Sequence, residues 1–63
     1  MGQIIKKARI VENSNGQWRV QAVGGNDEII MVTENYTHKE WAEVVATDLN
    51  VPIIWVPFRK PNG

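Results

Sequence analysis

Side chains that could carry out catalysis are scarce in this 63-residue chain. His38 is its only histidine and Ser14 its only serine, and it contains no cysteine. Nucleophilic catalysis needs a nucleophile, a neighbouring base and a third group that orients the base. Ser14 falls in a turn motif and His38 at the predicted start of a helix, so the sequence gives no reason for the two to meet. We therefore predict that the protein is not an enzyme and has no catalytic residues.

Metal and phosphate sites are supported no better. His38 could share a metal ion with Glu34 or Glu40, but the usual zinc ligand sets require a second histidine or a cysteine. Phosphate-binding loops place their glycines directly before a helix, whereas Gly24 and Gly25 precede a predicted strand. We expect no metal site and no cofactor.

The composition is that of one small domain without covalent supports. Seven basic and seven acidic residues give a formal net charge of zero, which provides no long-range attraction to nucleic acid or to anionic lipid. Without cysteine the chain can form neither a disulfide nor a thiolate metal site. Ordering a chain costs roughly 1.5 kcal/mol of conformational entropy per residue, so a core this small needs support. Oligomerisation is the remaining common source of that support.

The expected location is the cytoplasm. No stretch of the chain approaches the roughly 20 apolar residues that cross a membrane, and residues 1–7 lack the long apolar segment of a secretion signal. The absence of cysteine is compatible with a reducing compartment. We expect no association with membranes.

One helix is predicted among the elements that must position the polar side chains. Asn50 is expected to end this helix in a left-handed conformation. Thr37, followed three residues later by Glu40, predicts a capping box at the helix start. Tyr36 and Trp41 can close a hydrophobic staple across that start. The helical spacing predicts an apolar stripe that packs on a sheet, made of Trp41, Val44, Val45 and Leu49.

Two strands, residues 4–12 and 17–23, come before the helix and alternate between apolar and polar side chains. The loop between them ends in Asn15-Gly16, which allows a two-residue turn or a three-residue loop that begins at Ser14. Only the three-residue loop places apolar side chains opposite each other, with Gly16 in a left-handed bulge position. We therefore predict the pairs Ile10 with Val20 and Ala8 with Ala22.

Two further apolar segments are predicted as strands. Residues 28–33 carry apolar side chains on both faces, which is typical of a central or otherwise covered strand. A four-residue loop before this strand would place Ile29 opposite Ala22 and Met31 opposite Val20. Residues 53–58 form an apolar run without alternation, which indicates a fourth strand that is also covered on both faces.

Three motifs in this order resemble the YegP-like family of small domains of unknown function. They are the strand motif Gly16-Gln17-Trp18-Arg19-Val20-Gln21-Ala22, the turn Asn26-Asp27-Glu28-Ile29-Ile30 and the helix approach Glu34-Asn35-Tyr36-Thr37-His38-Lys39. The resemblance covers about two-thirds of the chain, from Asn13 to Asp48. The chain departs from the family in its helix, where Val44-Val45 replaces a frequent asparagine-glycine pair, and in its longer second turn.

The elements and the resemblance together predict an α+β fold with the order β-β-β-α-β, in which one helix packs on a face of an antiparallel sheet. We expect a single domain over residues 1–58 and a mobile tail over residues 59–63. The resemblance implies that two such units assemble into one sheet with their C-terminal strands exchanged. It implies no settled activity and no catalytic residues. The homodimer interface expected from it consists of Ile53, Ile54, Trp55, Val56 and Phe58.

Two functions from different classes fit these features. The first is a non-enzymatic protein-interaction module, a dimeric scaffold that serves as a small regulator or inhibitor of an unknown partner. It is supported by more large apolar side chains than a small core easily hides, namely Trp18, Tyr36, Trp41, Trp55 and Phe58.

The alternative function is nucleic-acid binding across the sheet face that the helix leaves open. In the register we favour, one face of the first hairpin carries Lys7, Arg9, Arg19, Gln17 and Gln21. No aromatic side chain is interleaved with these residues, and the chain as a whole is neutral. We therefore favour the interaction module.

Overall fold

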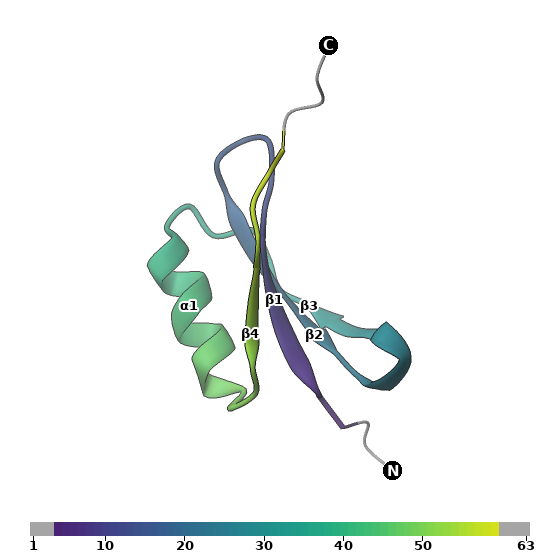
Figure 1. The fold of residues 1–63 in the computed structure, drawn as a ribbon. Helices are drawn as coiled ribbons and strands as arrows, with labels where there is room; N and C mark the ends of the chain where they lie inside the picture. The colour runs from purple at the N-terminus through teal and green to yellow at the C-terminus, as the bar shows by residue number, and fades with distance from the viewer. Residues whose placement is uncertain (1–3, 60–63) are drawn as a thin grey trace.

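The computed structural model describes residues 4–59, which form one four-stranded sheet with a helix on one face (Figure 1). A short 3-10 turn, η1 (Gly25–Asp27), connects the second and third strands. The sheet order is β3-β2-β1-β4. The predicted α+β fold and its β-β-β-α-β order are therefore confirmed. The elements are β1 (Lys7–Glu12), β2 (Trp18–Val23), β3 (Ile29–Val32), α1 (Lys39–Asp48) and β4 (Ile53–Val56).

The sheet is mixed, whereas we expected it to be antiparallel throughout. β1 pairs antiparallel with β2, and β2 antiparallel with β3, but β4 runs parallel to β1. The two hairpins leave β3 running in the same direction as β1, and α1 then returns the chain across the face of the sheet. The next strand must therefore enter parallel to β1. β4 pairs with β1 of its own chain, and exchange of β4 between two copies stays a prediction.

The first hairpin has the predicted register. Ile10 lies opposite Val20 and Ala8 opposite Ala22, and the Asn13 N–H donates to the Gln17 carbonyl at 2.9 Å to close a three-residue loop. Gly16 has φ +73°, the left-handed conformation that the loop requires.

Replacing Gly16 with alanine is expected to lower the free energy of unfolding by about 1 kcal/mol, because a side chain at φ +73° is strained. A Cβ at this position would meet no other atom within 4 Å, so the effect isolates the backbone term. Gly25→Ala is the matched control, since Gly25 has the same open space and no positive φ. Urea titrations measure both variants, and equal losses for the two would contradict the prediction.

The second hairpin differs from the predicted register. Ala22 lies opposite Met31 rather than Ile29, and Val23 lies opposite Ile29 across a bulge. The predicted four-residue loop is wrong. The Gly24 N–H donates to the Glu28 carbonyl at 2.8 Å, so this pair closes the hairpin and leaves only residues 25–27 in the turn. Within this turn Asn26 and Asp27 both take left-handed conformations, with φ 63° and 59°. The pattern of apolar residues in the sequence does not indicate two consecutive left-handed residues.

The position of β3 in the sheet was also predicted wrongly. Apolar side chains on both faces suggested a central or otherwise covered strand, yet β3 is an outer strand of the sheet. β4 is the other outer strand, and its expected coverage by a second copy stays a prediction. The helix packs on β1 and β2, and β3 twists away from it with the η1 turn (Figure 1). Apolar side chains of both outer strands are therefore exposed, as described below.

The core lies between α1 and the two central strands. Ala42 and Ala46 of the helix are fully buried against Ala8, Ile10 and Val20. Small side chains on the helix allow its backbone to approach the sheet closely. This close approach increases the van der Waals contacts between the two layers. The core is completed by partly buried side chains, namely Trp18, Tyr36, Val45, Leu49, Val51 and Ile53.

The predicted apolar stripe of α1 is only half right. Val45 and Leu49 pack on the core as expected, but Trp41 and Val44 are 54% and 61% exposed. The alanines at 42 and 46 occupy the space next to the sheet, and a large ring would not fit between these layers. Trp41 instead lies edge-on to His38, with ring centroids 4.7 Å apart.

The start of α1 also differs from the prediction. The cap is His38, in an extended conformation and without a side-chain capping hydrogen bond, so the expected Thr37–Glu40 capping box is wrong. The helix end agrees with the prediction, because Asn50 has φ 56° and its N–H donates to the Thr47 carbonyl at 3.0 Å.

Within residues 4–59 there is no helix with the length and apolar character of a membrane span. The predicted tail, residues 59–63, lies outside the described residues except for Arg59, which is exposed.

Candidate interaction surfaces

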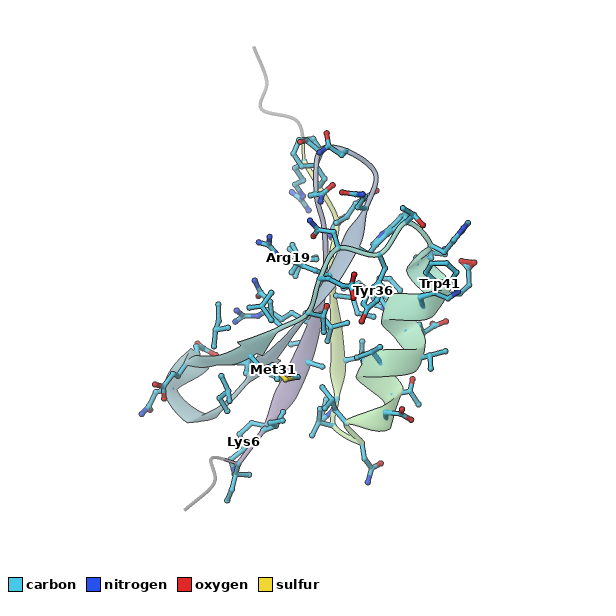
Figure 2. All side chains as sticks on the ribbon, turned by 180° about the vertical axis from the view of Figure 1, so that it is seen from behind. Lys6, Arg19, Met31, Tyr36 and Trp41 are labelled. Carbon is cyan, nitrogen blue, oxygen red and sulfur yellow. The ribbon has the colours of Figure 1, made fainter. Side chains whose placement is uncertain are left out.

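The predicted basic residues share the sheet face that lies opposite α1, called here the open face. Side chains alternate along a strand, so Lys7 and Arg9 point away from the helix that covers Ala8 and Ile10. Figure 2 shows Arg19 on the side of the sheet away from α1. The register places Arg19 opposite Val11 and Arg9 opposite Gln21. Gln17 lies just before β2, where its N–H donates to the Asn13 side chain at 3.1 Å.

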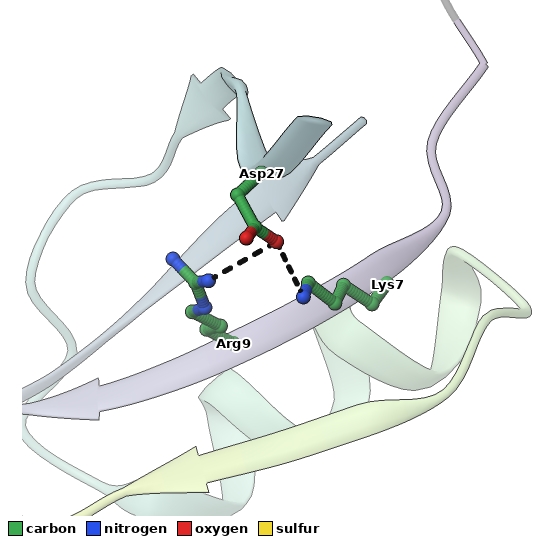
Figure 3. A network of polar contacts seen from close by, with 3 residues as sticks. All are labelled: Lys7, Arg9 and Asp27. Carbon is green, nitrogen blue, oxygen red and sulfur yellow. Dashed lines mark hydrogen bonds and ion pairs between the residues drawn. The ribbon is translucent and has the colours of Figure 1, made fainter. Parts of the chain in front are cut away.

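A carboxylate neutralises part of the open face. Lys7 Nζ donates to Asp27 Oδ1 at 2.7 Å, and an Arg9 guanidinium nitrogen lies 3.7 Å from the same oxygen (Figure 3). The left-handed turn carries Asp27 over the two basic side chains, which are 20 and 18 positions earlier in the chain. Sequence reasoning missed Asp27, because periodicity fixes the face of a strand residue but not the reach of a turn.

The Lys7 ammonium, through its hydrogen bond and its charge, holds the pKa of Asp27 below its ordinary value, and Arg9 adds to the effect. A depressed folded-state pKa means that the carboxylate stabilises the fold at pH values above its unfolded-state pKa. That contribution is lost as the pH falls through the folded-state pKa. The side chain is 69% exposed, so solvent screening keeps the contribution small.

Replacing Asp27 with asparagine is therefore expected to lower the unfolding temperature slightly at pH 7. The difference from the wild type should shrink as the pH falls below about 4 and vanish in stronger acid, where both chains carry a neutral group at this position. Thermal unfolding at pH 7, 4 and 2 measures the difference. Glu28→Gln is the control on the same turn, since no ion pair within residues 4–59 involves Glu28. A difference that stayed constant from pH 7 to 2 would refute this role of Asp27.

Aliphatic side chains interrupt the basic residues of the open face. Ile54 of β4 lies beside Arg9, Val56 beside Val11, and Val32 of β3 beside Gln21. Arg19 takes part in no ion pair within the described chain, and its Nε atom is buried there without a hydrogen-bond partner. The open face is thus a mixed surface with one unpaired cation.

Most of the predicted dimer residues of β4 carry exposed apolar side chains, which alternate between the two faces of the strand. Ile53 is partly buried against the core, while the other four side chains are between 37% and 45% exposed. These four, called here the β4 patch, are Ile54, Trp55, Val56 and Phe58. Phe58 lies beyond the strand, where its N–H donates to the Glu12 side chain at 3.2 Å. Exposed apolar side chains along the free side of an outer strand make this edge a candidate site of association.

The opposite edge of the sheet carries a second apolar segment, which sequence reasoning placed in the interior. Ile29, Met31 and Val32 of β3 are 48%, 44% and 48% exposed. Met31 lies on β3 beyond the region that α1 covers (Figure 2). We call the unpaired side of this strand the β3 edge.

The chemically reactive side chains do not gather around one point. Ser14 lies in the exposed β1–β2 loop, and His38 caps α1 with its ring against Trp41. Within the described part of the chain, no three histidine or acidic side chains converge as metal ligands would. Tyr36 pairs with Trp18 through two backbone hydrogen bonds of 2.9 and 2.6 Å, and its side chain packs on the core.

Comparisons of this chain with models of protein families, with curated proteins and with solved structures give no match.

Proposed function

We propose that the chain is a non-enzymatic protein-interaction module that works as a homodimer with exchanged β4 strands. In this proposal the dimer binds a partner protein as a small regulator or inhibitor. The β-β-β-α-β order of residues 4–59 is the order that the YegP-like resemblance implies for such a unit.

The single observation that carries the proposal is the imbalance between buried and exposed apolar side chains. Within residues 4–59 the fully buried apolar residues number seven, and four of them are alanine. Ten larger apolar side chains are exposed. Burying one side chain of the size of valine or isoleucine stabilises a protein by about 1.5–3 kcal/mol. The exposed apolar side chains contribute little to the stability of a single copy, and a domain of this size has a small core. Association with a second copy would bury some of them and add to the stability.

The connection between α1 and β4 favours exchange of the strand. Asn50, with φ 56°, ends the helix, and only Val51 and Pro52 separate it from β4. Short hinge connections of this kind promote domain exchange. The β4 strand that pairs with β1 can come from either copy, since the same register then forms between chains.

Pairing between the two β4 strands would cover the β4 patch. The Ala8 N–H donates to the Pro52 carbonyl at 2.9 Å, so alternation in the parallel ladder turns the backbone groups of Ile53 and Trp55 outward. Two β4 strands that meet antiparallel about Ile54 place Ile53 of one copy opposite Trp55 of the other. Pro57 has no N–H and limits this contact to the strand itself.

The basic open face gives weaker support to nucleic-acid binding. Asp27 pairs with Lys7 and Arg9, which leaves Arg19 as the one predicted basic contact without an ion pair in the described chain. Nucleic-acid affinity depends on the number of phosphates that free cations neutralise. The exposed apolar side chains of β3 and β4 can contact apolar side chains of another protein, but they cannot neutralise the phosphates of a nucleic acid.

Light scattering over a range of concentrations tests the dimer. The expected mass is twice the 7.2 kDa of one chain. Trp55→Ser in the β4 patch should lower the dimer fraction, whereas Trp41→Ser on the outer surface of α1, with similar exposure, should not. A mass of 7.2 kDa at every concentration would refute the dimer.

The partner class is tested by retrieval from cell extract after nuclease treatment. We expect a protein to be retained by the wild type and retained equally by the Arg9→Ala, Arg19→Ala double variant. Binding of single-stranded or duplex nucleic acid that falls steeply with salt, and that this double variant abolishes, would instead establish the alternative function.

A further inference from the structure

We infer that the β3 edge binds an extended segment of the partner protein, with an apolar centre flanked by lysine or arginine, as an added strand of the sheet. The inference rests on the proposed interaction function and assigns to it a surface and a class of partner segment. It concerns the end of the sheet farthest from β4, so it does not depend on how two copies assemble.

The two outer strands differ in how well their free sides are protected. Natural sheets protect an outer strand with proline, with lysine or with an inward-pointing charge, because unpaired backbone groups invite another strand. β4 lies between Pro52 and Pro57. β3 has the sequence Ile-Ile-Met-Val, with no proline and no charge. Pro57 limits strand addition on the free side of β4, whereas neither proline nor charge within the strand limits it at the β3 edge.

Backbone groups on the β3 edge are available to an incoming strand. The Thr33 N–H donates to the Val20 carbonyl at 2.9 Å, and Met31 lies opposite Ala22. Hydrogen-bonded and non-bonded positions alternate in an antiparallel ladder, so Val32 between them turns its N–H and C=O away from β2. An added strand can form its central pair of backbone hydrogen bonds with Val32.

Side chains on both faces of β3 would contact such a strand. Met31 lies on the helix side of the sheet and Val32 on the open face, and both are nearly half exposed. An added strand brings its own alternate side chains beside them on each face, at the separations where cross-strand pairs interact. Apolar residues at the centre of the partner segment match this edge.

The charges at the two ends of β3 select basic flanks. Glu28 precedes the strand and Glu34 follows it by two positions, and both are exposed and outside any ion pair of residues 4–59. A second copy of the chain is a poor occupant. Antiparallel pairing of two β3 strands about Met31 places Glu28 opposite Glu34, and parallel pairing places each glutamate beside its equivalent. A segment that ends in lysine or arginine removes this repulsion and adds attraction.

The probe for this inference is a capped peptide of alternating valine and threonine with one lysine at each end, titrated into the 15N-labelled full chain. We expect amide shifts confined to β3 and its flanks, with the largest at Val32. A peptide of the same centre with glutamate ends should bind at least tenfold more weakly at low salt, and added salt should narrow that difference. N-methylation of the peptide backbone groups that face Val32 should abolish binding.

A pair of valine variants locates the contact. Val32→Lys on the β3 edge should weaken binding of the lysine-ended peptide at least tenfold. Val44→Lys, on the exposed surface of α1, should leave it unchanged. The N-methylated peptide tests the same contact with the wild-type protein, so a folding defect in Val32→Lys cannot decide the outcome.

Three results would overturn the inference. They are the absence of shifts at β3 with millimolar peptide, equal affinity for lysine-ended and glutamate-ended peptides, and conversion of a dimer into a monomer by Val32→Lys. The last would mean that a second copy occupies the edge. A monomeric chain that binds the peptide at β3 would refute the proposed dimer and uphold this inference. A dimer that fails to bind the peptide would uphold the proposed dimer and refute this inference.

Discussion

Ile10→Ala is expected to lower the free energy of unfolding by about 2–5 kcal/mol. Ile10 is fully buried at the centre of β1, between Val20 on one side and Trp55 on the other, and it packs against the two alanines of α1. Removing its side chain leaves a cavity that the neighbouring strands cannot fill without breaking their ladders. A domain of this length has a stability of roughly 3–9 kcal/mol, so the variant should be partly or wholly unfolded.

Ile29→Ala provides the matched control, since it removes the same atoms from a residue that is 48% exposed. We expect a loss below about 1 kcal/mol there. Urea titration followed by tryptophan fluorescence compares the two variants, and the three tryptophans supply the signal. If the variants lose equal stability, the core does not lie between β1, β2 and α1.

Cutting the chain before Ile53 should unfold the protein rather than merely separate its subunits. Without β4, β1 loses the strand that pairs with it in parallel from Ala8 to Val11, and Ile10 loses its neighbour Trp55. The remaining three strands and helix would retain a core made mostly of alanine. Far-ultraviolet circular dichroism should show the loss of strand and helix signals together.

A chain that ends after Arg59 is the control for this truncation, and we expect it to stay folded, because it keeps β4 and Phe58. A synthetic peptide of residues 53–59, added to the truncated chain, should restore the fold in proportion to its concentration. Such rescue is the behaviour of a strand that can be supplied by another molecule. A truncated chain with unchanged spectra would show that β4 is dispensable.

The parts of the fold that follow from local rules could be predicted from the sequence. In the first hairpin, the apolar alternation and the glycine at 16 admit one register, because a shift by one residue would turn Ile10 and Val20 to opposite faces. The end of α1 at Asn50 is similarly local, since a left-handed residue before Val-Pro stops a helix.

The parts that depend on packing at a distance could not be predicted. The helical pattern of large apolar residues predicted that Trp41 and Val44 face the sheet. The space between helix and sheet admits only smaller side chains, and Ala42 and Ala46 occupy it. Apolar residues on both faces of β3 predicted a central or otherwise covered strand, but the place of β3 at one edge of the sheet depends on how all four strands pair. Asp27 reaches Lys7 only through the left-handed turn, whose conformation depends on the whole hairpin.

The proposed exchange of β4 is tested most directly by a pair of cysteines on neighbouring strands. The natural sequence has no cysteine, and Val11 of β1 lies opposite Val56 of β4, at a separation that a disulfide spans. The Val11→Cys, Val56→Cys variant is oxidised at low micromolar concentration and analysed by denaturing electrophoresis without reductant, beside the two single variants. Exchange predicts a covalent species of twice the 7.2 kDa chain mass in the double variant alone. A disulfide closed within a single chain, with all material at 7.2 kDa, would contradict the exchange.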